Sequence, residues 1–545
     1  MKKFIVIILM MSGCLIWTGC SHFDDLNKNP YTTNDASAAS FIQTITFTTQ
    51  SKILSTSYSL TSQLMQHAIA KSTSETTTLV YNYDINISHT KTFWDLYLQK
   101  GNAESMLAEA RKDNDMGLEG VALILRTYVM QIITDVYGDV PYFQAGLMPV
   151  EHENTEVNLK YDSQKEIYLD MLLSLEKANA LLAKASNFTA VLDNTYGGDV
   201  KSWRKLGNTL YLRLLMRMSN KVLEEDGGMI DLGEEYGFFD VRSKIAEIYD
   251  GYANKNGNYP IFQSVDDRAL VHYNTTNVSY YTPFNNTTGP LFKQIVACKT
   301  LVDAMVIKGE DGKVIKDEDG KSMIDPRYCY YFTTTYAGLP VQMDPLDVDE
   351  FLEKNSVAFY ASGSTYGNLK TGSAYSFMNY SEPLFIFAEA CCQEWIPGGT
   401  ARTKELYLKA CEASMMEWNP LDSRPSSLTT REKYLNYLDK DFIASGNPLE
   451  TIMLQKWIST FWYGVEAWSD YRRTGYPVLR TNGPAALNNS ILCTRMMYPY
   501  TEPYQNGTCY WEAVNGWLGG SDDMQTEVWF ASTQESINIR RKGRQ

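Results

Sequence analysis

Residues 118–142 read LEGVALILRTYVMQIITDVYGDVPY. Apolar residues recur in this stretch at spacings of three and four, at Leu118, Val121, Ala122, Leu125, Val129, Ile132, Ile133 and Val136. This spacing predicts an amphipathic α-helix, which Gly138 and Pro141 should end. Arg126 and Asp135 interrupt the apolar run, so it does not read as a membrane span.

The same periodicity extends outward along the chain. It predicts helices at 163–185, from about Lys201, at 380–395, at 403–418 and at 450–473. The segment from about Lys201 carries Trp203, Leu206, Leu210, Leu214 and Met218 on one face. The last should turn Met453, Trp457, Phe461, Val465 and Trp468 inward. Pro397-Gly398-Gly399 should fold 380–395 and 403–418 into an antiparallel hairpin. The fold class is therefore mainly α, with tetratricopeptide-like helical hairpins, although no strict 34-residue repeat is present.

Long polar segments rich in tyrosine separate these helices. They cover residues 252–290 and 330–372, and between them the Asp-Gly pairs of 308–325 predict a small β-hairpin. Long loops on a helical scaffold commonly carry binding function. We therefore expect one loop-rich face with minor β-hairpins.

Composition excludes some partners. The formal net charge is −15, which disfavours nucleic acid as a partner. Aromatic residues make up 13% of the chain and include 37 tyrosines, whose rings suit sugar stacking as well as cores. The cysteines are scattered and do not predict a disulfide framework.

The N-terminus predicts export. Lys2 and Lys3 precede an apolar run from Phe4 to Trp17 that is too short to span a bilayer. Cys20 follows directly after Gly19, as in a bacterial lipobox. We expect a signal peptide at 1–19, lipidation of Cys20, a tether over 20–36 and a single domain over 37–545.

Several segments resemble the SusD/RagB outer-membrane lipoproteins of Bacteroidetes. In family order they are DDLNKNP at 24–30, DVYGDVPY at 135–142, Trp203 with Asn208, Leu210 and Arg213, Asp325-Pro326-Arg327, Tyr380–Glu389 and EAWSDYRRTG at 466–475. Each motif alone is weak, but together they span nearly the whole mature chain.

This resemblance implies a function and a partner. It implies a surface-exposed lipoprotein, anchored to the outer membrane through lipid, that captures a nutrient oligomer. It also implies a SusC-like TonB-dependent transporter, over which the protein lies as a lid and to which it passes its ligand. We interpret most matched motifs as scaffold. Trp94, Trp203 and Trp468 are expected to be buried, and Asp135, Asp139 and Arg213 to be buried polar links or caps.

No motif for catalysis stands out. The five histidines show no metal-binding spacing, and no GxSxG sequence is present. Gly320-Lys321-Ser322 resembles a P-loop, but Ile315 stands where that motif needs glycine. We expect a protein that is not an enzyme and that needs no metal or cofactor; an outer-membrane glycosidase is the less favoured alternative.

Three loop segments combine tyrosine with amide side chains, a mixture suited to sugar rings and hydroxyls. Their candidate ligand-binding residues are Tyr81, Asn82, Tyr83, Tyr280, Tyr281, Tyr360 and Tyr366. We hypothesise that the three loops converge on one shallow platform for an oligosaccharide. The alternatives are that each tyrosine packs locally, that the ligand is an oligopeptide, or that the loops contact only the transporter.

Overall fold

The computed structural model gives a mainly α fold, as the sequence predicts. It describes residues 37–70, 80, 83–146, 158–188, 193–273, 281–283, 295–333, 335–341, 343–358, 374–419, 424–480, 492–533 and 535–538.

The longer helices form the framework of the fold. They are α3 (Ser40–Thr56), α6 (Tyr97–Lys112), α7 (Met116–Tyr137), α8 (Gln164–Leu182), α9 (Val200–Glu225), α11 (Val241–Asn254), α15 (Ser381–Cys392), α16 (Gly399–Trp418), α17 (Arg431–Ala444), α18 (Pro448–Ser459) and α19 (Gly464–Thr474). Shorter helices are η1 (Ser57–Thr61), α4 (Ser62–Leu64), α5 (Ile87–Thr90), η3 (Trp94–Leu96), α10 (Gly233–Tyr236), η4 (Val265–Asp267), α12 (Lys299–Met305), α13 (Tyr328–Tyr331), η7 (Pro345–Asp347), α14 (Val348–Lys354), α20 (Glu502–Gln505) and α21 (Gly507–Asn515).

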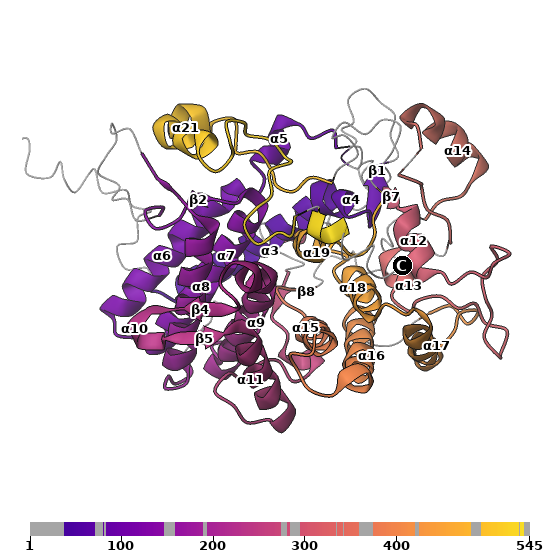
Figure 1. The fold of residues 1–545 in the computed structure, drawn as a ribbon, viewed down its shortest axis with the longest axis horizontal. Coiled ribbons are helices and arrows are strands. Elements are labelled where there is room, and N and C mark those ends of the chain that lie inside the picture. The colour runs from indigo at the N-terminus through magenta and orange to yellow at the C-terminus, as the bar shows by residue number, and fades with distance from the viewer. Residues whose placement is uncertain are drawn as a thin grey trace, which may run out of the picture.

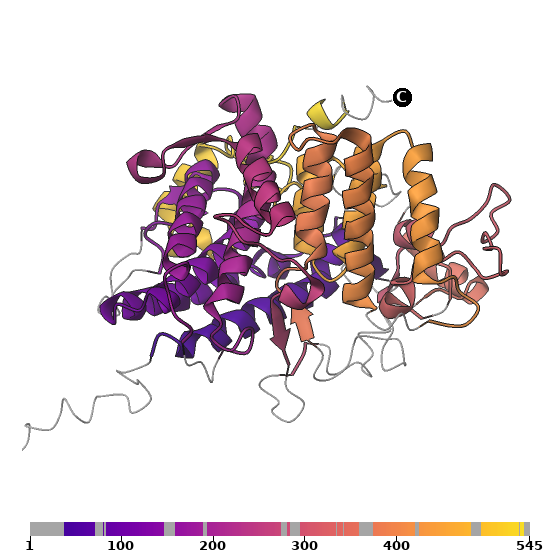
Figure 2. The ribbon, with the colours of Figure 1, turned by 90° about the horizontal axis from the view of Figure 1, so that it is seen from below.

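Helices that follow one another along the chain pack side by side. The run α6, α7, α8 and α9 forms one set, and α15, α16 and α17 form another, in which α18 packs against all three. Figure 1 shows the first set on the left and the second on the right, and Figure 2 shows the orange helices of the second set standing next to each other. These antiparallel neighbours are the predicted helical hairpins.

Helix α7 is the centre of the first set. Asp115 caps its N-terminus by accepting a hydrogen bond from the Leu118 N–H at 2.9 Å, and the helix ends at Gly138, where φ is +86°. In length and composition α7 is apolar enough to cross a membrane, but 78% of its most apolar window is buried inside the fold. Its apolar character therefore serves packing.

Neighbouring helices begin close to the predicted residues. The Ser163 and Glu166 side chains form a capping box for α8, and Asp199 caps α9 through the Ser202 N–H at 3.2 Å. The predicted inward face of α9 is buried, with Trp203 fully inaccessible. Polar caps and apolar spacing thus determine these two helices together.

The single helix expected at 450–473 is wrong, because the chain forms α18 and α19 with a break at 460–463. Gly464 starts α19 against η1, where a Cβ atom would lie 2.5 Å from the Thr61 Oγ1 atom and 2.7 Å from the Thr61 carbonyl carbon. The break also buries both Phe461 and Trp462, which one continuous helix would place on different faces.

Within the described ranges, four two-stranded antiparallel ladders accompany the helices. They pair β1 (Ala68–Ala70) with β7 (Ile295–Ala297), β2 (Val140–Pro141) with β3 (Tyr161–Asp162), β4 (Met229–Asp231) with β5 (Phe238–Asp240), and β6 (Leu270–His272) with β8 (Ala374–Ser376). The hairpin predicted at 308–325 forms only isolated bridges, Val306 to Ile324, Lys308 to Val314 and Lys316 to Ser322. The glycines of its two Asp-Gly pairs, Gly312 and Gly320, do occupy positive φ, as turns require.

Candidate functional site

The β1–β7 ladder brings two of the tyrosine-rich loop segments to one place. Ala70, the last residue of β1, pairs with Ile295, the first residue of β7. Because the strands are antiparallel, the chain after residue 70 and the chain before residue 295 leave the ladder at the same end. Both strands are buried, and Figure 1 shows them side by side near the upper edge of the molecule.

The third segment shares these anchors. The Ala297 N–H donates to the Ala358 carbonyl oxygen at 2.8 Å, so residue 358 lies against β7. At its other end Ala374, the first residue of β8, pairs with His272 of β6. Segments 274–294 and 359–373 therefore both begin at one of these two ladders and end at the other.

Packing fixes the β6–β8 ladder to the helical body. The Tyr273 ring lies 5.1 Å from the Phe47 ring of α3 and 5.8 Å from the Tyr375 ring of β8, between centroids. Its hydroxyl lies 3.2 Å from the Ser51 hydroxyl. The loop segments are thus anchored on rigid elements, the arrangement that a binding surface needs.

Most of the predicted ligand-binding residues lie outside the described part of the chain, and Tyr281 and Tyr83 lie within it. Tyr81, Asn82, Tyr280, Tyr360 and Tyr366 lie outside the described residues. Tyr281 is half-buried beside the buried Thr282.

Tyr83 lies in the loop between α4 and α5, as expected, but its side chain is only 4% exposed. Its backbone has φ of +65°, and burial raises the pKa of its phenol. The local-packing alternative therefore describes Tyr83 better than a ligand-stacking role does.

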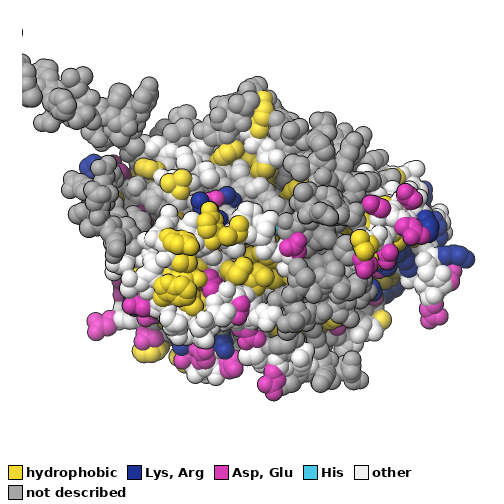
Figure 3. Space-filling model, turned by 90° about the horizontal axis from the view of Figure 1, so that it is seen from above, with side chains coloured by type: hydrophobic (Ala, Val, Ile, Leu, Met, Phe, Trp, Pro, Cys, Tyr) yellow, Lys and Arg dark blue, Asp and Glu magenta, His cyan; other side chains and the backbone are white. Residues whose placement is uncertain are grey.

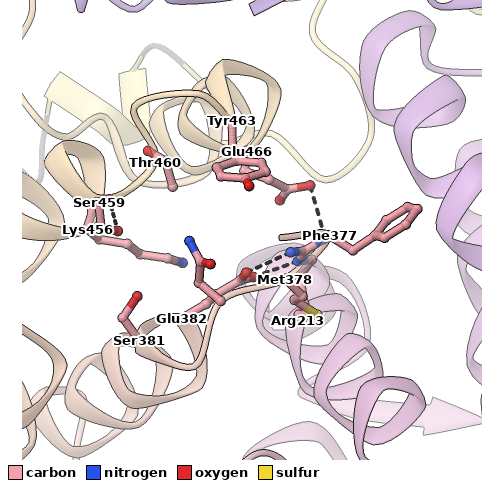
Figure 4. A pocket seen from close by; sticks show the side chains of 11 residues that line it. Arg213, Phe377, Met378, Ser381, Glu382, Lys456, Ser459, Thr460, Tyr463 and Glu466 are labelled. Carbon is pink, nitrogen blue, oxygen red and sulfur yellow. Dashed lines mark hydrogen bonds and ion pairs between the residues drawn. The ribbon is translucent and has the colours of Figure 1, made fainter. Parts of the chain in front are cut away.

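A small cavity with several charged residues in its lining lies among α9, α15, α18 and α19 (Figure 4). Arg213 and Lys456 extend toward it from α9 and α18, and Glu382 and Glu466 lie between them. Its volume is about 20 Å³, which is close to the space needed by one water molecule. The cavity is therefore far too small for a sugar or a peptide.

Charges around this cavity are already paired. Arg213 binds Glu382 through two hydrogen bonds of 2.6 Å and reaches Glu466 at 3.2 Å. Arg217 binds both Asp135 and Glu466. Burial alone would raise the pKa of Glu466, but the two guanidinium groups, with hydrogen bonds from Gln131 and Arg217, lower it. These ion pairs join α7, α9, α15 and α19 inside the fold.

The motif residues otherwise play the expected structural roles. Asp135 and Arg213 are buried links, and the Asp139 carboxylate accepts a hydrogen bond from the Gln164 N–H at 2.9 Å, which caps α8. Trp203 and Trp468 are fully buried, but Trp94 is only partly buried. In the part of the chain that the structure describes, no three His, Cys, Asp or Glu side chains cluster as metal ligands do.

Trp94 instead lines an open groove of about 620 Å³ that sequence reasoning missed. Tyr97, Glu502, Tyr504 and Gln505 also line it. The available signal was the sequence Tyr500-Thr501-Glu502-Pro503-Tyr504, in which two tyrosines enclose a threonine, a glutamate and a proline.

Comparison with known proteins establishes the family. The sequence profile of the SusD-like family, described as starch-binding and associating with outer membrane, matches residues 29–499. The chain belongs to this SusD-like family, whose members are binding proteins. No curated protein sequence matches the chain significantly.

Solved structures share the fold at low identity. A chitin-binding protein aligns with a TM-score of 0.68 and 23% identity over 91% of this chain and 100% of its own. A SusD homologue from Bacteroides fragilis gives 0.68 and 22% over the same shares. A chitin-binding SusD homologue from Flavobacterium johnsoniae gives 0.66 and 22% over 89% of this chain and 97% of its own.

Proposed function

We propose that this protein is a cell-surface lipoprotein that captures a nutrient oligomer, a glycan, and passes it to a SusC-like TonB-dependent transporter. The observation that carries the proposal is the shared anchoring of the three tyrosine-rich segments at the β1–β7 and β6–β8 ladders. The family's description as starch-binding, and the chitin-binding proteins of the same fold, support a glycan as the ligand class.

The proposed anchor is lipid on Cys20, which would hold the protein at the outer membrane. The family's association with that membrane supports this location. Residues 20–36 would then act as the tether to the body. Apart from the buried Tyr83, the predicted tyrosines of the three segments would stack on sugar rings, and their neighbouring amides would bind hydroxyl groups.

Calorimetric titration of the soluble chain starting at Ser21 tests this proposal. The panel is maltohexaose, chitohexaose, plant and microbial polysaccharides, and a peptide digest. Tyr281→Ala should weaken glycan binding about three- to tenfold, since one stacking ring is worth about 0.5–1.5 kcal/mol, with little change in melting temperature.

The matched control is Phe238→Ala, which removes a 71% exposed ring on β5. Equal loss of binding and of stability in Tyr281→Ala would contradict a ligand-contact role. A response to the peptide digest alone, weakened by salt, would replace the glycan with an oligopeptide. Product release from a polysaccharide, abolished by one carboxylate substitution, would support the glycosidase alternative.

A further inference from the structure

The groove beside Trp94 is separate from the loop anchors and has its own chemistry. We propose that it is a second ligand site, which binds a neutral oligosaccharide between Trp94 and Tyr504. The glycan class is the one of the proposed function, on which it rests, but the groove and the loop segments use different residues. Either site can therefore fail alone.

The floor of the groove is fixed before any ligand arrives. The backbone N–H of Trp94 donates to the Tyr137 hydroxyl at 3.1 Å. The Trp94 ring packs edge-on against the rings of Tyr97 and Tyr137, with centroids 5.0 and 5.1 Å apart. The Tyr97 hydroxyl donates to the Pro141 carbonyl oxygen at 2.6 Å. These contacts hold the rings in place, so binding loses little conformational entropy there.

The opposite wall is the single helical turn α20. Glu502 and Asn506 are one turn apart and face inward, where the Tyr161 hydroxyl donates to Glu502 at 2.6 Å. The Asn506 amide donates to the Leu159 carbonyl oxygen at 2.8 Å and accepts from the Leu159 N–H at 2.9 Å. The wall is therefore tied to the β3 side of the groove.

Tyr504 stands at the rim of this wall. It is 88% exposed, more than any other large hydrophobic side chain in the described ranges, and Gln505 beside it is also exposed. The exposed Tyr504 ring is therefore accessible for stacking at the edge of the groove. In Figure 3 hydrophobic side chains gather on this upper face of the molecule, which Figure 1 shows to carry α21 and α5.

The lining indicates the ligand class. Aromatic faces offer stacking against sugar C–H groups, and the exposed Gln505 amide offers a partner for hydroxyls. The volume of about 620 Å³ falls within the range of sites for small organic ligands. The described lining contains one carboxylate and no lysine or arginine, so it favours a neutral glycan over an anionic one.

Hydroxyl-radical footprinting reads this groove directly, through oxidation of Tyr504 in the full soluble chain. The probes are maltohexaose, chitohexaose and, as the anionic comparison, a hexamer of galacturonic acid. At least one neutral hexamer should slow Tyr504 oxidation twofold or more and leave oxidation of Phe238 unchanged. Tyr504→Ala should lower the association constant of that hexamer about three- to tenfold.

Two variants separate this site from the loop segments. In Tyr281→Ala the protection of Tyr504 should persist, whereas Gln505→Ala should reduce it. Failure of both neutral hexamers to protect Tyr504 would overturn the site. Equal protection by the galacturonic acid hexamer would overturn the neutral-glycan assignment. Glycan binding that Tyr281→Ala leaves unchanged, with Tyr504 still protected, would overturn only the proposed role of the loop segments.

Discussion

Arg473, in the last turn of α19, and Glu389, on α15, form a two-pronged ion pair inside the protein. The Arg473 Nη1 and Nη2 atoms lie 2.5 and 2.7 Å from the two carboxylate oxygens of Glu389, and neither side chain is more than 1% exposed. Arg473 also reaches Asp470 at 3.3 Å, and Asp470 binds Lys456 at 2.8 Å. The Arg473–Glu389 pair therefore links α15 to α19, and the Asp470–Lys456 pair links α18 to α19.

Glu389→Gln should lower the free energy of unfolding by about 3–5 kcal/mol, because it leaves the Arg473 charge buried without a full partner. Urea denaturation followed by circular dichroism measures this loss. The matched control is Glu405→Gln, which breaks an exposed pair with Arg402 and should change stability by less than about 1 kcal/mol. Equal effects of the two substitutions would contradict a structural role for the buried pair.

Glu417 should make stability depend on pH. Burial raises its pKa to about 7, against hydrogen bonds from Ser381 and the nearby Arg268 charge. Its folded pKa lies above the unfolded value of 4.5, so its contribution is fully present below pH 4.5 and is lost as pH rises through 7. At about 1.4 kcal/mol per pKa unit, the loss is on the order of 3 kcal/mol.

Glu417→Gln removes this titration and keeps partners for the Ser381 N–H and hydroxyl, which lie 2.9 and 2.6 Å from the carboxylate. The melting temperature of the variant, relative to the wild type, should therefore be higher at pH 8 than at pH 4.5. Parallel melting curves at both pH values would show that another group carries the pH dependence.

Two glycine substitutions should have opposite signs. Gly464→Ala would place a Cβ atom 2.7 Å from the Thr61 carbonyl carbon and 2.8 Å from the Ser62 nitrogen, so we expect a loss of about 1–3 kcal/mol. Gly101→Ala, within α6, meets no atom within 4 Å and should stabilise the protein by about 0.5–1 kcal/mol. Calorimetric melting of both variants checks the pair, and a stable Gly464→Ala protein would contradict the close approach of η1 and α19.

Cys20→Ser should abolish lipid attachment if the proposed anchor is correct. Metabolic labelling with palmitate should disappear, and the chain should move from the membrane fraction to the soluble fraction. Cys14→Ser is the matched control, because Cys14 lies inside the predicted signal peptide. Retained labelling in Cys20→Ser would remove the lipoprotein assignment.

Local signals account for most of what the sequence predicted correctly. The spacing from Leu118 to Val136 and the Gly138 stop are encoded in one continuous stretch of sequence, so α7 could be placed without a structure, and the same periodicity placed α8. The break before Gly464 could not, because its cause is Thr61, about four hundred residues earlier in the chain.

In the candidate site, too, some features are encoded locally in the sequence and others depend on residues far apart in the chain. Composition was enough to single out the tyrosine-rich segments, but their shared anchors depend on the register of Ala70 with Ile295, which no local pattern encodes. Burial of Tyr83 and partial exposure of Trp94 reversed the expected roles of these two aromatic residues. In both cases tertiary neighbours decide whether a ring faces the core or the solvent.

The two ladders that anchor the loop segments also bear on how the ligand preference of such a protein can change during evolution. Main-chain hydrogen bonds make the pairings at Ala70–Ile295 and His272–Ala374, and these impose little demand on side-chain identity. Substitutions or insertions between the anchors can therefore accumulate without disturbing the helices beneath. Evolution can in this way retune ligand preference while the scaffold is inherited unchanged.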